Sequence, residues 1–339
     1  MIKFLLAPLL LIASIIIAYI DIVYIPLFFI IQSIFIIIGD LILPRDYTVY
    51  DDKFSSLFNF FVMLPLPLLL IYLFISVDGL YNKYLFGELS FITIMGNIMQ
   101  MGLMLGTAGT NAGHELIHRA KNSIHEEFGY WLLGLSFDTA FVIEHVHGHH
   151  KFVGTINDPA TARLNENTYS FIIRSTIGTI KNAWRYEKER LVRRKKNIFS
   201  LANKLILGFL KGMLIMGMVY YIGKEFGVLV YLASIIIAKI LLETVNYIEH
   251  YGLTREEGSP VLPKHSWNTN RWASSNVLYN LSRHSAHHEK SNVPYWKLNP
   301  YKDAPEMPLG YLSMVYVALL LPPVFKRIME PRVIKWNNI

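Results

Sequence analysis

The sequence predicts an all-α integral membrane fold, in which a six-transmembrane-helix bundle carries a histidine-rich cap on one side. Long uncharged stretches indicate the membrane helices, because roughly 20 largely apolar residues suffice to cross a bilayer. Charge is scarce overall, with 17% charged residues among 339, against about 25% in an average soluble domain. Ten of the twelve histidines fall into four short clusters that follow or end an apolar stretch.

Four stretches near the start of the chain contain no charged residue, namely 4–20, 22–39, 54–77 and 89–114. We expect six spans in all, near residues 3–20, 22–42, 56–77, 90–112, 203–223 and 226–246. Asp21 separates the first two spans, which should form a tight hairpin, and Lys224 and Glu225 mark the turn between the last two. A signal peptide is not favoured, because no small-residue cleavage site precedes Asp21.

Three charged residues fall inside the last two spans. We expect Lys211 to extend its ammonium group toward the membrane surface. Lys239 and Glu243 are four residues apart, so they share a helix face and can pair with each other. Residues 307–325 are uncharged but interrupted by prolines, which favours an interfacial or re-entrant helix, and residues 128–143 are too short to cross.

The distribution of basic residues predicts which side of the membrane the cap occupies. Six spans place both termini on one side, and the densely basic segment 181–196 should be cytoplasmic. The cap, formed by residues 114–202 and 247–339, is then cytoplasmic too, and residues 1–339 form a single integral membrane domain. The basic segment could attract anionic lipid headgroups or dock an acidic protein. Nucleic acid is not an expected partner, because no recognisable binding module is present.

The chain contains no cysteine. A disulfide framework, a thiolate zinc site, an iron–sulfur cluster and a cysteine nucleophile are therefore excluded. Any metal site in this sequence must use nitrogen and oxygen ligands.

The four histidine clusters have the spacing of metal ligands. They read HELIH at 114–118, EHVHGHH at 144–150, NYIEHYG at 246–252 and RHSAHH at 283–288. Residues four apart share a helix face, so we expect His114 to act with His118. By the same spacing His145 should act with His149, with His150 turned to an adjacent direction. In the last cluster, His284 can pair with His287 or His288.

Convergence of the four clusters at one membrane face predicts a site with two metal ions. Nine ligands are too many for one ion, whereas two ions with four or five ligands each fit the number. Imidazole suits zinc, copper, iron and nickel, but catalytic zinc usually takes three protein ligands. Higher coordination with an open position suits iron that binds O2. Four acidic residues beside the clusters are expected to accept the other ring N–H: Glu115, Glu144, Asp158 and Glu249.

A zinc protease is the rival interpretation of the first cluster. His114-Glu115-Leu116-Ile117-His118 matches the H-E-x-x-H signature, in which the glutamate acts as general base. That interpretation gives no reason for the other clustered histidines. Metal content distinguishes the two, because the protease requires one zinc and the alternative requires two irons.

The motifs resemble those of the membrane-bound non-haem di-iron alkane 1-monooxygenases, within the superfamily of integral-membrane desaturases and hydroxylases. HELIHR at 114–119, EHVHGHH at 144–150, NYIEHYGL at 246–253 and LSRHSAHH at 281–288 are similar to the four motifs of that family. The segment NDPATAR at 157–163 is also similar, and the resemblance covers about residues 36–332. Arg119 and Ser282 stand where the family usually has lysine and glutamine, and neither position holds a ligand.

The resemblance implies a set of nine metal ligands: His114, His118, His145, His149, His150, His250, His284, His287 and His288. His147 is at a non-ligand position of its motif, and His125 and His265 are expected to be surface or structural residues. The implied cofactors are two iron ions, with O2 as co-substrate and neither haem nor flavin. Electrons would come from rubredoxin, supplied in turn by an NAD(P)H-dependent rubredoxin reductase.

The expected reaction is hydroxylation of an alkane at its terminal carbon to a primary alcohol, in a bacterial inner membrane. An unactivated C–H bond offers no acid–base route, so the chemistry must come from O2 bound at the metals. The same site could instead act on a xylene-type methyl group or a fatty acyl lipid, and metal transport or storage is less favoured. Aromatic side chains that could line a substrate channel are Tyr24, Phe28 and Phe61. Basic residues that could dock the electron carrier are Arg190, Arg193, Arg194, Lys195 and Lys196.

Overall fold

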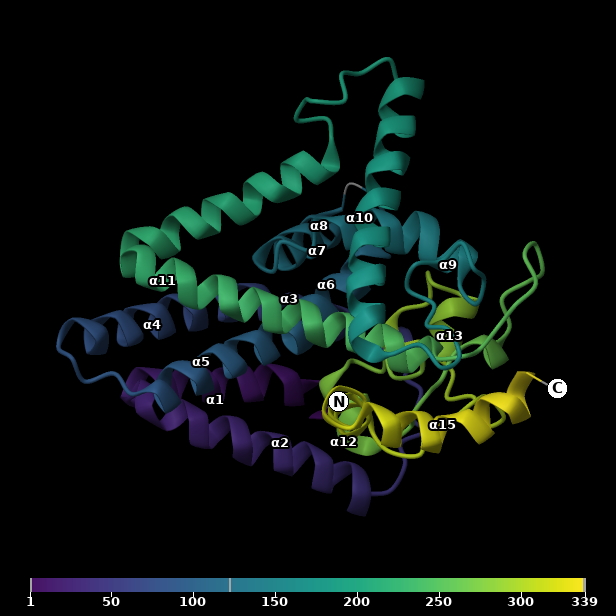
Figure 1. Ribbon diagram of the computed structural model, residues 1–339, viewed down its shortest axis with the longest axis horizontal. Helices are drawn as coiled ribbons and strands as arrows, with labels where there is room; N and C mark the ends of the chain where they lie inside the picture. The colour runs from purple at the N-terminus through teal and green to yellow at the C-terminus, as the bar shows by residue number, and fades with distance from the viewer. Residues whose placement is uncertain (1, 122, 338–339) are drawn as a thin grey trace.

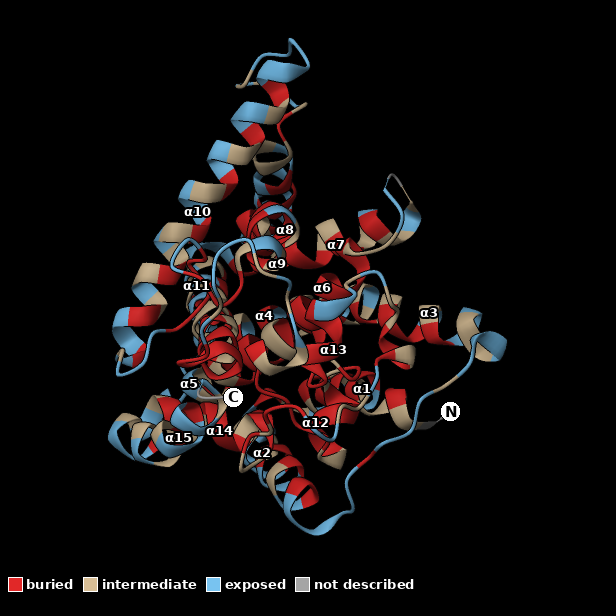
Figure 2. Ribbon diagram, turned by 90° about the vertical axis from the view of Figure 1, so that its right-hand side faces the viewer, coloured by how far each residue is buried: buried red, intermediate tan, exposed pale blue. Residues whose placement is uncertain are grey.

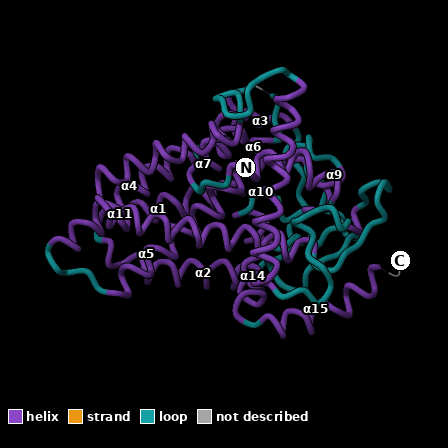
Figure 3. Tube along the Cα trace, turned by 45° about the horizontal axis from the view of Figure 1, so that its top comes forward, coloured by secondary structure: helices purple, strands orange, loops and turns teal. Residues whose placement is uncertain are grey.

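The computed structural model describes residues 2–121 and 123–337, and the regular secondary structure of this part of the chain is helical. It contains no β-strand, and the one isolated β-bridge joins Asn268 and Glu306. The helices divide into a set of long rods on one side of the molecule and a set of shorter helices and loops on the other (Figures 1 and 3). The all-helical prediction is therefore confirmed.

The long rods lie side by side and are apolar enough to cross a membrane. They are α1 (Leu6–Ile20), α2 (Ile25–Ile42), α4 (Pro65–Leu85), α5 (Phe91–Met104) and α11 (Lys204–His250). With the short helices that continue them, they give five candidate spans in the described chain: Lys3–Ile20, Ile22–Ile42, Asp52–Leu85, Phe91–Ile117 and Lys204–His250.

The last of these helices, α11, is 47 residues long and breaks at Lys224, where φ is 50° and ψ is −150°. The chain turns back there, so α11 forms two arms (Figure 1). The turn predicted at Lys224 and Glu225 is thus present. A Cβ atom at Gly223 would lie 2.5 Å from Val77 on α4, so only glycine permits this close approach. Five continuous helices are observed, and six spans result only if each arm of α11 crosses separately.

Some buried polar groups within the spans contact one another. The Gln100 side chain donates to Ser14 (2.9 Å) and accepts from Gln32. Lys239 pairs with Glu243 at 2.7 Å, as predicted, and also with both carboxylate oxygens of Asp138 at 3.2 Å.

Lys211 behaves differently from the prediction. Its side chain is only 10% exposed and forms an ion pair with Glu127, instead of extending to the membrane surface. Glu127 lies in α7 (Ile124–Leu135). The pair therefore ties a cap helix to the first arm of α11, which a single span considered alone could not reveal.

Two short helices extend the rods: α3 (Ser55–Met63) leads into α4, and α6 (Asn111–Ile117) lies beyond α5. The cap lies over the ends of the rods (Figure 2) and includes the 26-residue helix α10 (Thr168–Arg193). Its shorter helices are α7, α8 (Thr139–Glu144), α9 (His150–Phe152), α12 (Trp272–Val277), α13 (His284–Glu289), α14 (Tyr311–Leu320) and α15 (Pro322–Asn337). Segment 307–325 contains α14, whose ten residues are too few to cross a bilayer. Segment 128–143 is divided between α7 and α8.

Candidate metal centre

Four segments from distant parts of the sequence bring the histidine clusters to one place. They are α6, the turn between α8 and α9, the end of α11, and α13. α6 follows the π-helical turn Leu105–Thr110, and the turn between α8 and α9 is itself the π-helical turn His145–His149. Such turns are rare and occur frequently at functional sites. The predicted convergence of the clusters is therefore observed.

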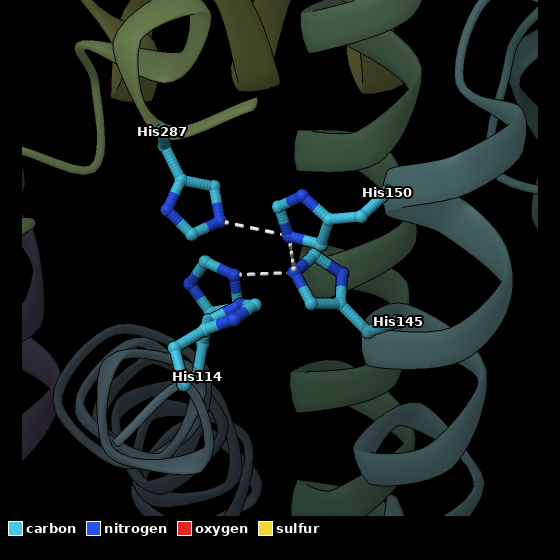
Figure 4. A group of neighbouring side chains, drawn as sticks. His114, His145, His150 and His287 are labelled. Carbon is cyan, nitrogen blue, oxygen red and sulfur yellow. Dashed lines mark hydrogen bonds between the residues drawn. The ribbon is translucent and has the colours of Figure 1, made fainter. Parts of the chain in front are cut away.

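Nine histidines form two groups, and within each group the candidate ligand atoms all lie within 4.8 Å of one another. The five-histidine group consists of His114, His118, His145, His150 and His287. The four-histidine group consists of His149, His250, His284 and His288. Four members of the five-histidine group point toward a common centre in Figure 4.

The ring nitrogens in the five-histidine group face one another. Nε2 of His145 lies 2.5 Å from Nε2 of His114 and 3.0 Å from Nε2 of His150. Nε2 of His287 lies 3.1 Å from Nε2 of His150. The His118 ring contacts the His114 ring edge-on, with centroids 5.0 Å apart.

The four-histidine group has the same arrangement. Nε2 of His284 lies 3.0 Å from Nε2 of His250 and 2.9 Å from Nε2 of His288. Nε2 of His149 lies 3.1 Å from Nε2 of His288. All four side chains are buried.

These separations fit a bound metal ion. Nitrogen ligands at about 2.1 Å from an ion, and at right angles, would lie roughly 3 Å from each other. In a neutral imidazole, Nε2 either carries a hydrogen and donates or carries a lone pair and accepts. Facing Nε2 atoms can therefore hydrogen-bond only in donor–acceptor pairs, and the five-histidine group leaves at least one Nε2 without a partner. A cation at the centre of each group would accept the lone pairs of all the facing nitrogens. The donor set, made of imidazoles only, suits iron, zinc, copper or nickel.

Burial keeps these imidazoles in the form that binds metal. It lowers the pKa of His145, His150 and His287 well below that of free histidine. The pKa of His118 is lowered to about 3, mainly by burial and also by the neighbouring His149 and Arg119. These four rings are therefore neutral at pH 7, as metal ligation requires. His149 differs, because the neighbouring Asp158 outweighs burial and raises its pKa above the usual value.

The pairing within the second cluster corrects the sequence prediction. His145 was expected to act with His149, four residues on, but it lies instead with His150, five residues on. His149 belongs to the four-histidine group. The π-helical turn at His145–His149 explains the change, because its i→i+5 bonding aligns residues five apart. In the last cluster, His284 acts with His288, and His287 belongs to the other group.

Two of the four predicted carboxylates contact a histidine of these groups. Asp158 Oδ2 accepts a hydrogen bond from His149 Nδ1 at 2.9 Å, and both side chains are almost fully buried. Burial would raise the pKa of Asp158, but His149 and the Thr161 hydroxyl hold it below its usual range. Glu249 Oε2 lies 3.3 Å from His284 Nε2. Asp158 therefore fixes a ring orientation, and Glu249 lies beside ligand atoms.

The other two carboxylates make different contacts. Glu115 pairs with Arg119 at 2.6 Å and accepts the backbone N–H of Tyr295 at 3.2 Å. Glu144 accepts a hydrogen bond from Asn182 at 3.4 Å. Burial raises the pKa of Glu144 to about 8, and the nearby Asp158 adds to the shift. Their expected role as acceptors for ring N–H groups stays a prediction.

An apolar cavity of about 100 Å³ ends at the histidines. Its walls include His114 and His145 of the five-histidine group and His284 of the four-histidine group. Glu249 also lines it. The remaining lining is largely aliphatic, and its members include Leu10, Ile36, Met104, Leu241, Val277, Leu312 and Val315.

The sequence prediction did not find this lining. Tyr24 is 56% exposed, Phe28 is half-buried, and Phe61 packs in the core at 6% exposure. None of the three is among the described residues that line the cavity. The aliphatic residues that do line it are ordinary span residues in sequence, so no motif distinguishes them from lipid-facing neighbours.

The five candidate docking residues lie at the C-terminal end of α10 and in the turn that follows. Arg190 forms an ion pair with Glu187 at 2.5 Å and donates to the backbone of Ala202 at 2.6 Å, so it is engaged within the chain. The exposed ones are Arg193, Arg194, Lys195 and Lys196.

The three remaining histidines lie outside both groups. His147 is exposed, His125 is half-buried, and the buried His265 accepts a hydrogen bond from the backbone N–H of Leu262 at 3.0 Å. Their positions agree with the surface and structural roles predicted for His125 and His265.

The amino-acid sequence of the chain is similar to a family model and to several known enzymes. A family model described as fatty acid desaturase matches residues 90–318. Alkane 1-monooxygenase 1 of Pseudomonas aeruginosa is 35% identical over 73% of the chain and 66% of the relative. Alkane 1-monooxygenase of Pseudomonas putida is 35% identical over 74% of the chain and 63% of the relative. The chain thus spans slightly less than two thirds of either enzyme.

A further relative is matched over more of its length. The xylene/toluene monooxygenase hydroxylase component XylM of Pseudomonas putida is 31% identical over 88% of the chain and 80% of the relative.

Proposed function

The chain is a multi-pass membrane protein of the fatty acid desaturase family, related to the alkane 1-monooxygenases, and we propose that it hydroxylates the terminal carbon of alkanes at a di-iron site. The overall reaction is RH + O2 + 2 e⁻ + 2 H⁺ → ROH + H2O. The nine histidines of the five- and four-histidine groups would hold the two ions.

One observation carries the proposal: the cavity that ends at histidines of both groups is apolar. A cavity without charged groups, apart from Glu249 at its histidine end, can hold an alkyl chain but offers little to a polar substrate. Its walls come from helices long and apolar enough to cross a membrane, such as α2 and α5. An alkane dissolved in the bilayer therefore has a matching environment from lipid to histidine.

Two iron ions would supply the O2 chemistry that an unactivated C–H bond requires. The chain's own residues hold and orient the reacting groups. Asp158 fixes the ring of His149 through its hydrogen bond to Nδ1. Glu249 places a carboxylate 3.3 Å from His284 Nε2, where it can hold a proton beside the reacting end of the cavity. The aliphatic walls exclude water and leave one end of the substrate's alkyl chain facing the histidines.

Electron supply and topology complete the proposal. The chain has no cysteine and hence no iron–sulfur centre of its own, so we assign electron delivery to rubredoxin and an NAD(P)H-dependent reductase. The exposed basic residues 193–196 would attract such an acidic partner. If each arm of α11 crosses separately, six spans put both termini and the cap on the cytoplasmic side of a bacterial inner membrane.

Hydroxylation of a xylene-type methyl group is a second candidate. It is favoured by the match to XylM, which covers 88% of the chain and more of the relative than the alkane monooxygenase matches do. An apolar cavity accommodates an aryl methyl group as well as an alkyl chain. The two candidates differ in the shape of the substrate and share the same site.

Product analysis decides between them. Membranes containing the chain, supplied with rubredoxin, its reductase, NADH and O2, should convert octane or hexadecane to the 1-alkanol, identified by gas chromatography and mass spectrometry. Exclusive conversion of xylene to methylbenzyl alcohol would support the second candidate. Protein that holds two irons but oxidises none of these substrates would refute both. His284→Ala, which removes a proposed ligand, serves as the inactive control.

A further inference from the structure

An open pocket lies between the start of α1 and the segment that follows α2. This outer pocket has a volume of about 550 Å³. The two helices are antiparallel because the chain turns at Asp21, so the start of α1 and the end of α2 lie at the same end of the rods (Figure 1). The short helix α12 packs against both. One candidate span begins at Lys3 and the next ends at Ile42, so the outer pocket lies at the depth expected for the membrane–water interface.

One side of the outer pocket is apolar and accessible. Leu9 on this side is 50% exposed, and Leu6 and Trp272 complete it. Tyr47 lines the pocket as well and is 38% exposed. Tryptophan and tyrosine are enriched at membrane–water interfaces, because each combines an apolar ring with a polar group. An acyl chain of a lipid can therefore reach this side from the bilayer.

The charged groups around the outer pocket leave an excess of positive charge. Asp46 is shared by two cations, because it forms an ion pair with Lys3 and lies 3.8 Å from Arg283. Arg45 pairs with Glu306 at 3.2 Å. Three cations thus face two carboxylates, which favours an anion as the ligand.

Arg45 and Lys302 are the cations that an anion in the outer pocket can reach. The Arg45 side chain lines the pocket, is 48% exposed, and uses only Nε to pair with Glu306. Its two Nη groups have no hydrogen-bond partner in the described part of the chain. Lys302 is exposed, and its Nζ lies 4.8 Å from the centre of the Tyr47 ring. A guanidinium presents its N–H groups in a planar fork that matches two oxygen atoms of a phosphate.

We propose that the outer pocket binds an anionic phospholipid, whose phosphate accepts hydrogen bonds from the Nη groups of Arg45 and whose acyl chain packs against Leu6 and Leu9. Basic pockets between membrane helices bind such headgroups. A free phosphate would leave the apolar side of the pocket uncovered, and a zwitterionic headgroup would bring an ammonium group to a site with excess positive charge. The inference goes beyond the proposed reaction and does not depend on it.

The bound lipid would support one wall of the apolar cavity that ends at the histidines. On α1, Leu6 lines the outer pocket and Leu10, one turn later, lines the cavity. On α12, Trp272 lines the outer pocket and Val277 lines the cavity. These four residues pack in one hydrophobic cluster with Ile36. An acyl chain on the outer side of this layer would hold the layer against the cavity.

Photoaffinity labelling of the full chain in detergent micelles tests the proposal. The probe is phosphatidylglycerol with a diazirine near the carboxyl end of one acyl chain, and labelled peptides are mapped by mass spectrometry. We expect labelling of residues 6–9 that excess phosphatidylglycerol prevents. Phosphatidylcholine, whose headgroup has no net charge, should compete about fivefold less well, which corresponds to about 1 kcal/mol. Inorganic phosphate should not compete. Equal competition by phosphatidylcholine, or displacement of the probe by inorganic phosphate, would overturn the proposal.

Variants and a matched control make the test specific, with the labelling of the whole chain that excess phosphatidylglycerol prevents as the measured quantity. Arg45→Gln should lower this labelling about fivefold, and the double variant Arg45→Gln, Lys302→Gln about 25-fold. Arg332→Gln makes the same change at an exposed arginine of α15 that does not line the pocket, and should leave labelling unchanged.

Leu9→Trp fills the apolar side of the outer pocket from a position that is 50% exposed and leaves all the charges in place. It should also reduce labelling, so it decides the matter if Arg45→Gln does not fold. Labelling that neither the double variant nor Leu9→Trp reduces, or that Arg332→Gln reduces as much as Arg45→Gln does, would overturn the proposal.

Discussion

Asp158→Asn is the most informative single change at the metal centre, because it keeps the shape of the side chain and alters only its charge and hydrogen bonding. Asp158 Oδ2 accepts from His149 Nδ1 (2.9 Å) and from the Thr161 hydroxyl (2.6 Å), and Oδ1 accepts from the Ala160 N–H (3.0 Å). Asparagine has one acceptor atom where aspartate has two. Whichever way its amide turns, its NH2 group faces either the His149 or the Ala160 donor.

The expected effect is large because the site is dry. The side chains of His149 and Asp158 are 1% and 0% exposed, so water cannot replace the lost acceptor. Loss of a carboxylate that supports a metal-bound histidine typically weakens metal affinity 10–100-fold, which corresponds to about 1.4–2.7 kcal/mol. His149 belongs to the four-histidine group, so we expect the weakening at that group and little change at the five-histidine group.

Competition with a chelator of known iron affinity measures this prediction. The wild type should lose its two irons over a narrow range of chelator concentration, and Asp158→Asn should lose one of them at a 10–100-fold lower chelator concentration. Asp303→Asn is the matched control, since Asp303 is exposed and the substitution makes the same change in charge.

Two results would refute the reasoning. If Asp158→Asn retains both irons as tightly as the wild type, the hydrogen bond to His149 does not orient a ligand. If both irons weaken equally, the two groups do not bind separate ions as the geometry indicates.

Three further predictions follow from particular contacts. His287→Ala and His288→Ala should each retain one iron but leave different sites occupied, because these adjacent residues belong to different groups; identical Mössbauer spectra of the two variants would contradict this. Burial would raise the pKa of Glu166, but two hydrogen bonds from Arg174 (2.6 and 2.8 Å) hold it below its usual range. Its carboxylate therefore stabilises the fold above about pH 4.3 and loses this effect as pH falls through the folded pKa. Glu166→Gln should accordingly make the melting temperature fall less steeply as pH decreases. Equal dependence of the melting temperature on pH in the wild type and the variant would disprove the linkage. Reversing the charges at 193–196 should reduce NADH-coupled turnover several-fold at low salt, with iron content unchanged. At about 0.5 M salt, where screening is strong, the reversal should not reduce turnover. Turnover that changes neither with the charge reversal nor with the salt concentration would exclude this surface as the docking site.

Much of the architecture could be predicted from local patterns in the chain. The bilayer by itself explains uncharged stretches such as 22–39 and 89–114. No contact with another part of the protein is needed to account for them. The turn at Lys224 was also predictable, since a charged pair interrupts the apolar run. The behaviour of Lys211 was not, because its partner Glu127 is 84 residues away along the chain.

The sequence by itself determined which residues gather at the metal centre. The histidine spacings and the apolar stretches that place the clusters are local properties, and all nine histidines converge as their motifs indicate. Only the tertiary structure decided how they divide. The π-helical turn pairs His145 with His150 rather than His149, and α13 sends His287 to one group and His288 to the other. The cavity beside the histidines likewise depends on packing between α1, α2, α5, α11, α12 and α14, because most of its walls are common aliphatic residues whose direction is set by neighbours distant in the chain.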